Sequence, residues 1–109
     1  MADPNEDLVF VSLPIPAQAE NPAIWRHAIE HDLSPALEGL GADLSGGGTY
    51  FDPDGDARTG EIFIYGSPGR PIFEAVVKCL AAHPSVPRDT TVALHIGEKG
   101  LEERTWTKA

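Results

Sequence analysis

The sequence predicts a single α+β domain in which two helices pack on one face of an antiparallel sheet. Three observations predict it: the expected elements follow the order β-α-β-β-α-β with a further strand at the end, two segments repeat apolar residues at helical spacing, and the chain has 109 residues. A chain of this length forms one core and has no room for a second independent unit. We therefore expect one domain over 1–109, with 1–7 as a frayed N-terminal segment.

The first strand is expected in the apolar run 8–13, which is rich in β-branched residues and ends at Pro14. Asn21 and Pro22 are typical of a helix N-cap and a first helical position. Pro35 is expected to kink or end this helix near 32–34, because proline lacks the N–H that continues the helix. The apolar stripe of the helix consists of Trp25, Ala28, Ile29, Leu33, Ala36 and Leu37.

The rest of the chain continues the alternation of strands and helices. Glycines 46–48 interrupt the second strand, 42–51, so that it is expected to be an edge strand or a bulged one. The third strand, 61–65, alternates apolar residues after a glycine. A second helix is expected from Pro71 to the region of His83, and its stripe is Ile72, Phe73, Val76, Val77 and Leu80. The last two strands are expected at 91–96 and 101–107.

Strand alternation divides the sheet into two faces. The face toward the helices should carry Val9, Val11, Leu13, Ile62, Ile64, Val92, Leu94 and Ile96. The opposite face should then carry Phe10, Phe63, Tyr65 and His95. An aromatic face without helices indicates a partner, a dimer mate or a covering segment.

This order of elements is similar to the ferredoxin-like split βαβ arrangement, with a C-terminal strand added. The similarity implies that the first and third strands are central in the sheet. Those two strands are the most apolar in the sequence, which agrees with the implied positions.

The charge balance is strongly acidic, with 17 Asp and Glu against 8 Lys and Arg and a formal net charge of −9. Such a charge repels nucleic-acid phosphates and anionic lipid, and it speeds the encounter with basic proteins. The single cysteine, Cys79, excludes an intrachain disulfide and is expected to be a small buried side chain. With no signal peptide or membrane-spanning stretch in view, we expect a cytoplasmic protein.

A dense acidic cluster, Asp52, Asp54 and Asp56, precedes the third strand. Carboxylates at alternate positions are typical of the start of a calcium loop. The pattern then fails, because Ala57 stands where the loop needs its glycine and Phe63 where it needs the closing Glu. An Asp- and Gly-rich hairpin loop, a calcium site and an acidic recognition loop all remain open.

Residues His27 to His31 match H-x-x-E-H, in which two histidines one helical turn apart bind zinc and the glutamate activates water. Both histidines fall on the side of the helix opposite the apolar stripe, and no third ligand is identifiable. We therefore expect a solvated polar helix face, with no metal and no cofactor.

The segments 9–14 and 59–65 resemble the two ribonucleoprotein motifs of an RNA recognition motif, whose aromatic residues on the first and third strands stack bases. Phe10, Phe63 and Tyr65 stand at corresponding kinds of position. The first motif is one residue short, the basic residue expected just before the glycine of the second motif is displaced to Arg58, and Glu61 replaces an aromatic position. The resemblance implies a single-stranded nucleic-acid-binding domain, which the acidic charge disfavours.

The sequence favours a binding protein without catalysis. In size and charge it resembles the small bacterial immunity proteins, and this similarity implies an inhibitor that occludes the basic active-site cleft of a toxin nuclease or deaminase. We expect a basic protein partner, with neither nucleic acid nor membrane as ligand. The expected partner-binding residues are Asp52, Asp54, Asp56, Glu61, Tyr50 and Tyr65. The alternatives are the nucleic-acid-binding domain above and a small dimeric structural or interaction protein.

Overall fold

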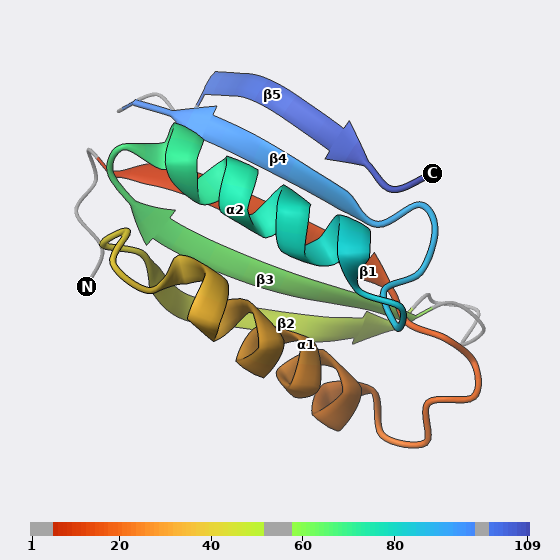
Figure 1. The fold of residues 1–109 in the computed structure, drawn as a ribbon. Coiled ribbons are helices and arrows are strands. Elements are labelled where there is room, and N and C mark those ends of the chain that lie inside the picture. The colour runs from red at the N-terminus through yellow and green to blue at the C-terminus, as the bar shows by residue number, and fades with distance from the viewer. Residues whose placement is uncertain (1–5, 52–57, 98–100) are drawn as a thin grey trace.

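The structure, a computed structural model, describes residues 6–51, 58–97 and 101–109. Its elements are β1 (Asp7–Pro14), α1 (Pro22–Leu37), β2 (Asp43–Phe51), β3 (Arg58–Gly66), α2 (Gly69–Ala82), β4 (Thr91–Ile96) and β5 (Leu101–Thr107). The five strands form one sheet in the order β2-β3-β1-β4-β5, and every neighbouring pair is antiparallel (Figure 1).

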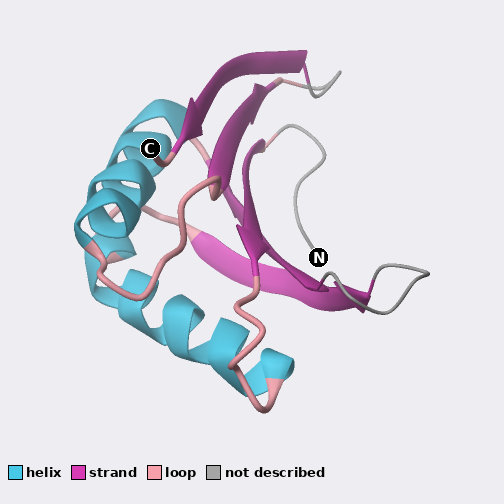
Figure 2. Cartoon of the chain, turned by 90° about the vertical axis from the view of Figure 1, so that its right-hand side faces the viewer, coloured by secondary structure: helices cyan, strands magenta, loops and turns pink. Residues whose placement is uncertain are grey.

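Both helices lie on the same side of the curved sheet, and no helix of the described residues lies on the opposite side (Figure 2). The predicted α+β class, with two helices on an antiparallel sheet, is confirmed. The first and third strands, β1 and β3, lie side by side inside the sheet, and the expected C-terminal strand is present beside β4. Within the described segments, no helix is both long and apolar enough to cross a membrane.

The core lies between the sheet and the helix layer. Strand alternation places every second residue of β1, β3 and β4 in it, and the buried strand side chains are Val9, Val11, Leu13, Ile62, Ile64, Val92 and Leu94. Ile96, at the end of β4, is partly buried against the same cluster. The helices contribute Ile29, Leu33 and Leu37 from α1 and Ile72, Phe73, Val76 and Leu80 from α2. Full burial of each such side chain stabilises the fold by about 1.5–3 kcal/mol, which explains the strict patterning.

Helix α1 begins as the sequence predicts, because the Asn21 side chain accepts a hydrogen bond from the Ile24 N–H at 3.1 Å. Its end differs, since the helix continues through Pro35 to Leu37. Proline removes one backbone hydrogen bond there, but Leu33 and Leu37 are both buried. The burial of these two leucines explains why the last turn keeps its helical path.

The buried stripe of α1 also differs from the prediction at two positions. Ala28 is exposed, whereas Arg26, which the pattern places on the polar side, has only 8% of its surface exposed. Helical periodicity predicts that this arginine lies on the surface. It does not show that glycines of the sheet leave space for the Arg26 side chain. The prediction for these two residues was therefore wrong.

The expectation of a frayed segment extending to residue 7 was wrong for Asp7, which is buried and forms the first residue of β1. Its Oδ2 accepts a hydrogen bond from the Gly69 N–H at 2.8 Å, and its Oδ1 accepts one from the Gly97 N–H at 3.1 Å. Pro68, the N-cap of α2, offers no side-chain acceptor. Asp7 supplies the missing cap from the other end of the sequence.

Strand β2 is an edge strand with a register shift between Leu44 and Gly47, which confirms the predicted edge or bulge. Gly47 has φ +134°, and a Cβ at this position would lie 2.1 Å from the Glu61 carbonyl oxygen. Only glycine fits that close approach of the two strands. The bulge therefore depends on the triple-glycine segment that the sequence shows.

Candidate protein-binding face

The sheet side without helices, here called the open face, is formed by alternate residues of the strands. Direct pairing across β1, β3 and β4 places Leu8 between Tyr65 and His95, and Phe10 between Phe63 and Ala93. The rings of Phe10 and Phe63 stack with their centroids 5.2 Å apart and their planes at 25°. The predicted set of Phe10, Phe63, Tyr65 and His95 thus lies together on the open face, where all four side chains are partly buried.

Tyr50 belongs to the same face through its pairing with Thr59. It is 53% exposed. A Cβ on Gly48 would lie 3.1–3.2 Å from the Tyr50 ring and hydroxyl, so the ring lies over this glycine. The glycine lets the tyrosine lie along the sheet surface instead of projecting from it.

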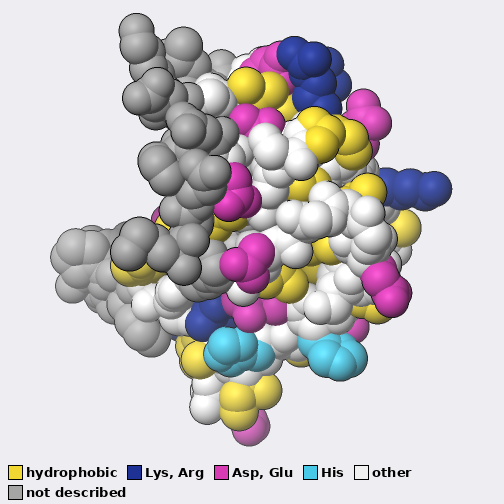
Figure 3. Space-filling model, turned by 90° about the vertical axis from the view of Figure 1, so that its left-hand side faces the viewer, with side chains coloured by type: hydrophobic (Ala, Val, Ile, Leu, Met, Phe, Trp, Pro, Cys, Tyr) yellow, Lys and Arg dark blue, Asp and Glu magenta, His cyan; other side chains and the backbone are white. Residues whose placement is uncertain are grey.

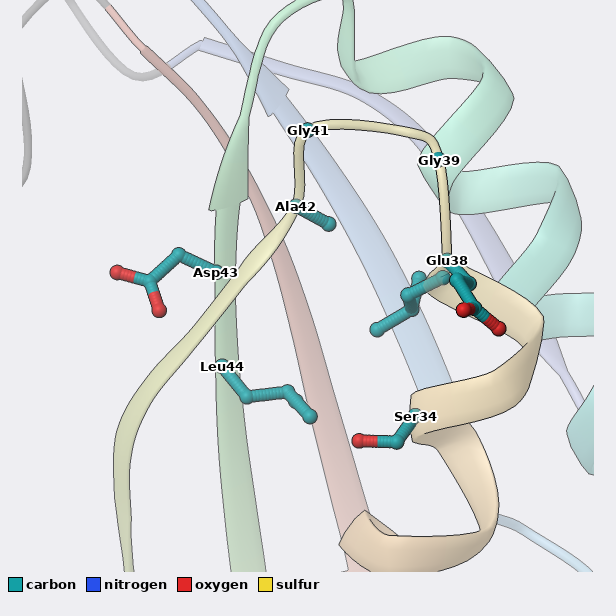
Figure 4. A pocket seen from close by; sticks show the side chains of 8 residues that line it. Ser34, Glu38, Gly39, Gly41, Ala42, Asp43 and Leu44 are labelled. Carbon is teal, nitrogen blue, oxygen red and sulfur yellow. The ribbon is translucent and has the colours of Figure 1, made fainter.

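Two carboxylates lie among these aromatic residues. Glu61 pairs with Ser12 on one side and with Gly48 on the other. Asp43 pairs directly with Tyr65, and its side chain points away from α1 (Figure 4). Three of the expected partner-binding residues, Tyr50, Glu61 and Tyr65, are therefore on one face. Asp43 joins them, although the sequence did not identify it.

The expected contacts Asp52, Asp54 and Asp56 lie outside the described residues, so the three interpretations of this acidic loop stay untested. On the molecular surface, acidic side chains are spread over the end that Figure 3 shows and are interspersed with few Lys or Arg. The register places no Lys or Arg on the open face within the described parts of β1 to β5. This face therefore combines aromatic surface with negative charge.

Two arginines, Arg26 and Arg58, are held on the helix side of the sheet. Arg26 pairs with Glu30, and its Nε donates to the Thr49 hydroxyl at 3.3 Å. Its stem lies over Gly60, where a Cβ would be 3.2 Å from the Arg26 Cδ. Arg58 donates to the backbone carbonyls of Pro16 and Ala19. Both guanidinium groups therefore fix the local structure, and Arg58 is not presented where the RNA-binding resemblance needs a cation.

The H-x-x-E-H segment of α1 does not form a metal cluster. His27 Nδ1 lies 3.2 Å from Glu30 Oε2, while His31 has 89% of its side chain exposed. Among the described residues, no group of three His, Cys, Asp or Glu side chains is close enough to hold a metal ion. The two histidines lie on the polar face that the sequence predicts.

The cysteine lies between the helices and is only partly buried against the core, whereas the sequence predicts a small buried side chain. Its thiol lies 3.7 Å from the Asp32 carbonyl oxygen. Burial, and then the charge of Asp32, raise the pKa of the Cys79 thiol above its ordinary value, so the nucleophilic thiolate is disfavoured.

A histidine at the end of α2 also contacts α1. His83 Nδ1 accepts a hydrogen bond from the Ser85 N–H at 3.1 Å, which leaves its Nε2 to donate to Asp32 Oδ2 at 2.6 Å. This hydrogen bond ties α2 to α1.

Two hollows lie away from the open face. One, of about 350 Å³, lies between the end of α1 and the start of β2, with Ser34 and Leu44 on its walls (Figure 4). The other, of about 510 Å³, is a groove between the helices lined by Ala36, Ala75, Lys78, Cys79 and Ala82. The polar side chains on the walls are Ser34, Glu38 and Asp43 in the first hollow and Lys78 and Cys79 in the second.

The outer strand β5 is tied to α2 and does not cover the open face. Arg70 bonds to Glu103, and this hydrogen bond lowers the pKa of Glu103 and raises that of Arg70. Trp106 pairs with Val92 and packs against the core on the helix side. The aromatic side chains of the open face are therefore not closed by Trp106.

Comparison of the chain with family models, with curated proteins and with solved structures finds no match in any of the three.

Proposed function

We propose that this chain is a non-catalytic protein-binding module that uses its open face to bind a basic protein. The observation that carries the proposal is the gathering of Tyr50, Glu61 and Tyr65, together with Asp43, on the side of the sheet without helices. Tyrosine supplies large contact area at a low entropic cost and is enriched at the energetic centres of interfaces. The carboxylates among these rings favour a partner of opposite charge.

The partner proposed is an enzyme whose basic cleft binds nucleic acid, such as a toxin nuclease or deaminase. The net charge of −9 supports this choice, because an acidic module competes with nucleic-acid phosphates for the Lys and Arg side chains of the partner's cleft. In this account the module acts as an immunity protein, and Asp52, Asp54 and Asp56 remain predicted contacts.

We further propose that the fold is ferredoxin-like, with β5 as an addition. The support is the order β2-β3-β1-β4 of the first four strands, with both helices on one side. In this arrangement the two helices leave the other side of the sheet free for a partner.

The test is affinity capture from the source cells with three matched forms of the chain. The face variant combines Tyr50→Ser with Glu61→Gln, and the control combines Ile24→Ser with Glu20→Gln on the helix side. Each variant removes one large hydrophobic side chain and one carboxylate. The two hydrophobic side chains are comparably exposed, Ile24 at 65% and Tyr50 at 53%. We expect one basic protein to be recovered with the natural chain and with the control, and at least about tenfold less with the face variant.

The recovered protein is then assayed for activity on nucleic acid with increasing amounts of the chain. An immunity role predicts loss of activity at equimolar chain. Equal recovery with all three forms would contradict the assignment of the open face, and recovery of an acidic protein would contradict the proposed charge complementarity.

One observation favours the alternative of single-stranded nucleic-acid binding, namely the stacked Phe10 and Phe63 on adjacent central strands. The open face nevertheless lacks Lys and Arg among the described strand residues, so base stacking, at about 1–3 kcal/mol per base, acts there without phosphate contacts. This alternative predicts a gel shift of single-stranded RNA at low salt that Phe63→Ala abolishes. The dimer alternative predicts a doubled mass in solution that the face variant abolishes.

A further inference from the structure

On the open face, the strand register pairs one acidic residue with a tyrosine and another with the glycine that lies under a tyrosine ring. Asp43 and Tyr65 are direct partners across β2 and β3, and such pairs have Cβ atoms about 4.5–5.5 Å apart. Glu61 pairs directly with Gly48, and the ring of Tyr50 lies over that glycine. Each of these two sites therefore combines a negative charge with an aromatic surface.

The two sites have a defined separation. Glu61 and Tyr65 are four residues apart on β3, which corresponds to about 13 Å at the rise of an extended strand. Phe63 lies between them and stacks on Phe10. The face thus presents two acidic sites with an apolar surface at the midpoint.

We infer that the open face recognises two arginine side chains of its partner, about 13 Å apart, with an apolar side chain between them. This inference rests on the proposed function and specifies the chemistry of the partner. A guanidinium group is planar, stacks on an aromatic ring and pairs with a carboxylate through two hydrogen bonds, whereas an ammonium group does so less well. Residues at positions one, three and five of an extended segment match the spacing, because alternate side chains point to the same side.

A second copy of this chain packed through the same open face is a poor occupant, because it carries the same charge. It would place its own Asp43 and Glu61 against the same two side chains, and like charges across an interface are unfavourable. Arg26 and Arg58 are held on the helix side by Glu30 and by the carbonyls of Pro16 and Ala19. Neither is available to a second copy.

The test is an NMR titration of the full chain with three synthetic peptides. The first is Ser-Arg-Ser-Leu-Ser-Arg-Ser, the second replaces both arginines with lysine, and the third has the same composition with the arginines adjacent. We expect the first peptide to shift the ring signals of Tyr50, Phe63 and Tyr65 and to bind about fivefold more tightly than either of the others. The variants Asp43→Asn and Glu61→Gln should each weaken it about fivefold, while Glu20→Gln should leave the affinity unchanged.

Equal binding of the three peptides, or no shift of the tyrosine rings at about 10 mM peptide, would overturn the arginine inference. Either result leaves the capture experiment intact, because that experiment uses the complete partner. Conversely, equal capture by the face variant and its control would contradict the proposed function even if the peptides bind. The two claims can therefore fail separately.

Discussion

Asp7, the first residue of β1, accepts a hydrogen bond from the backbone N–H of Gly69, the first residue of α2, at 2.8 Å. The two are 62 positions apart in the sequence. The position of Gly69 leaves no space for a side chain, since a Cβ there would lie 2.6 Å from the Asp7 Cβ. A negative charge at a helix N-terminus is favourable, and here it also joins the first strand to the second helix.

Replacing Asp7 with alanine should lower the free energy of unfolding by about 1–3 kcal/mol, because the buried Gly69 N–H and the partly buried Gly97 N–H lose their acceptor. The measurement is urea unfolding followed by circular dichroism, with the exposed Glu20→Gln as the control. Asp7→Asn keeps one acceptor oxygen and should lose less. A loss in Asp7→Ala no larger than that of the control would show that the cap contributes nothing.

Gly47→Ala should destabilise the fold by about 3 kcal/mol or more, because its Cβ would overlap the Glu61 carbonyl oxygen and the backbone has φ +134°. Gly39→Ala is the matched comparison, since Gly39 has φ +83° with nothing within 4 Å of an added Cβ. It should cost only about 1–2 kcal/mol of left-handed strain. Similar losses in the two variants would argue against the close strand approach at Gly47.

Arg26→Ala should lower the stability by about 2–4 kcal/mol, because Glu30 loses its ion-pair partner and the space over Gly60 is emptied. Arg26→Met keeps the length of the stem and should lose less than half of that amount. A double-mutant cycle with Glu30→Gln separates the ion pair from the packing. Identical stability of the alanine and methionine variants would contradict the packing role of the stem.

The carboxyl group of Glu103 should titrate below its ordinary pKa of 4.5, because Arg70 donates hydrogen bonds to it. A carboxyl group with a lowered folded-state pKa stabilises the fold above its unfolded-state pKa, and this contribution is lost as the pH falls through the lowered value. Carbon-13 NMR of the Glu103 carboxyl group measures the midpoint. In Arg70→Gln the midpoint should rise toward 4.5, and an unchanged midpoint would contradict the interaction.

Alternation and periodicity predicted the elements of this fold because they report which side of each element is buried. They placed Val9, Ile62 and Leu94 toward the helices, and Phe10 and Phe63 on the other face, as the structure has them. They failed at Pro35 and at Arg26. In both cases a tertiary feature outweighs the local preference: buried leucines hold the last turn of α1, and glycines of the sheet make room for an arginine.

Strand alternation also predicted part of the candidate site. Tyr50, Glu61 and Tyr65 follow from the strand pattern of one hairpin. The position of Asp43 did not follow from this pattern. Asp43 lies beside Tyr65 because of a strand register that the bulge between Leu44 and Gly47 sets. A bulge shifts pairing by an amount that composition does not specify.

The central claim, that a basic partner covers the open face, is tested most directly by chemical footprinting of the complex formed with the captured protein. The chain has two tyrosines, Tyr50 and Tyr65, and both lie on this face. His31 on α1, with 89% of its side chain exposed, reports on the helix side. The account predicts that a saturating partner slows iodination of Tyr50 at least about tenfold and leaves modification of His31 unchanged. Protection of His31 with unchanged iodination of Tyr50 would place the partner on the helix layer and contradict the account.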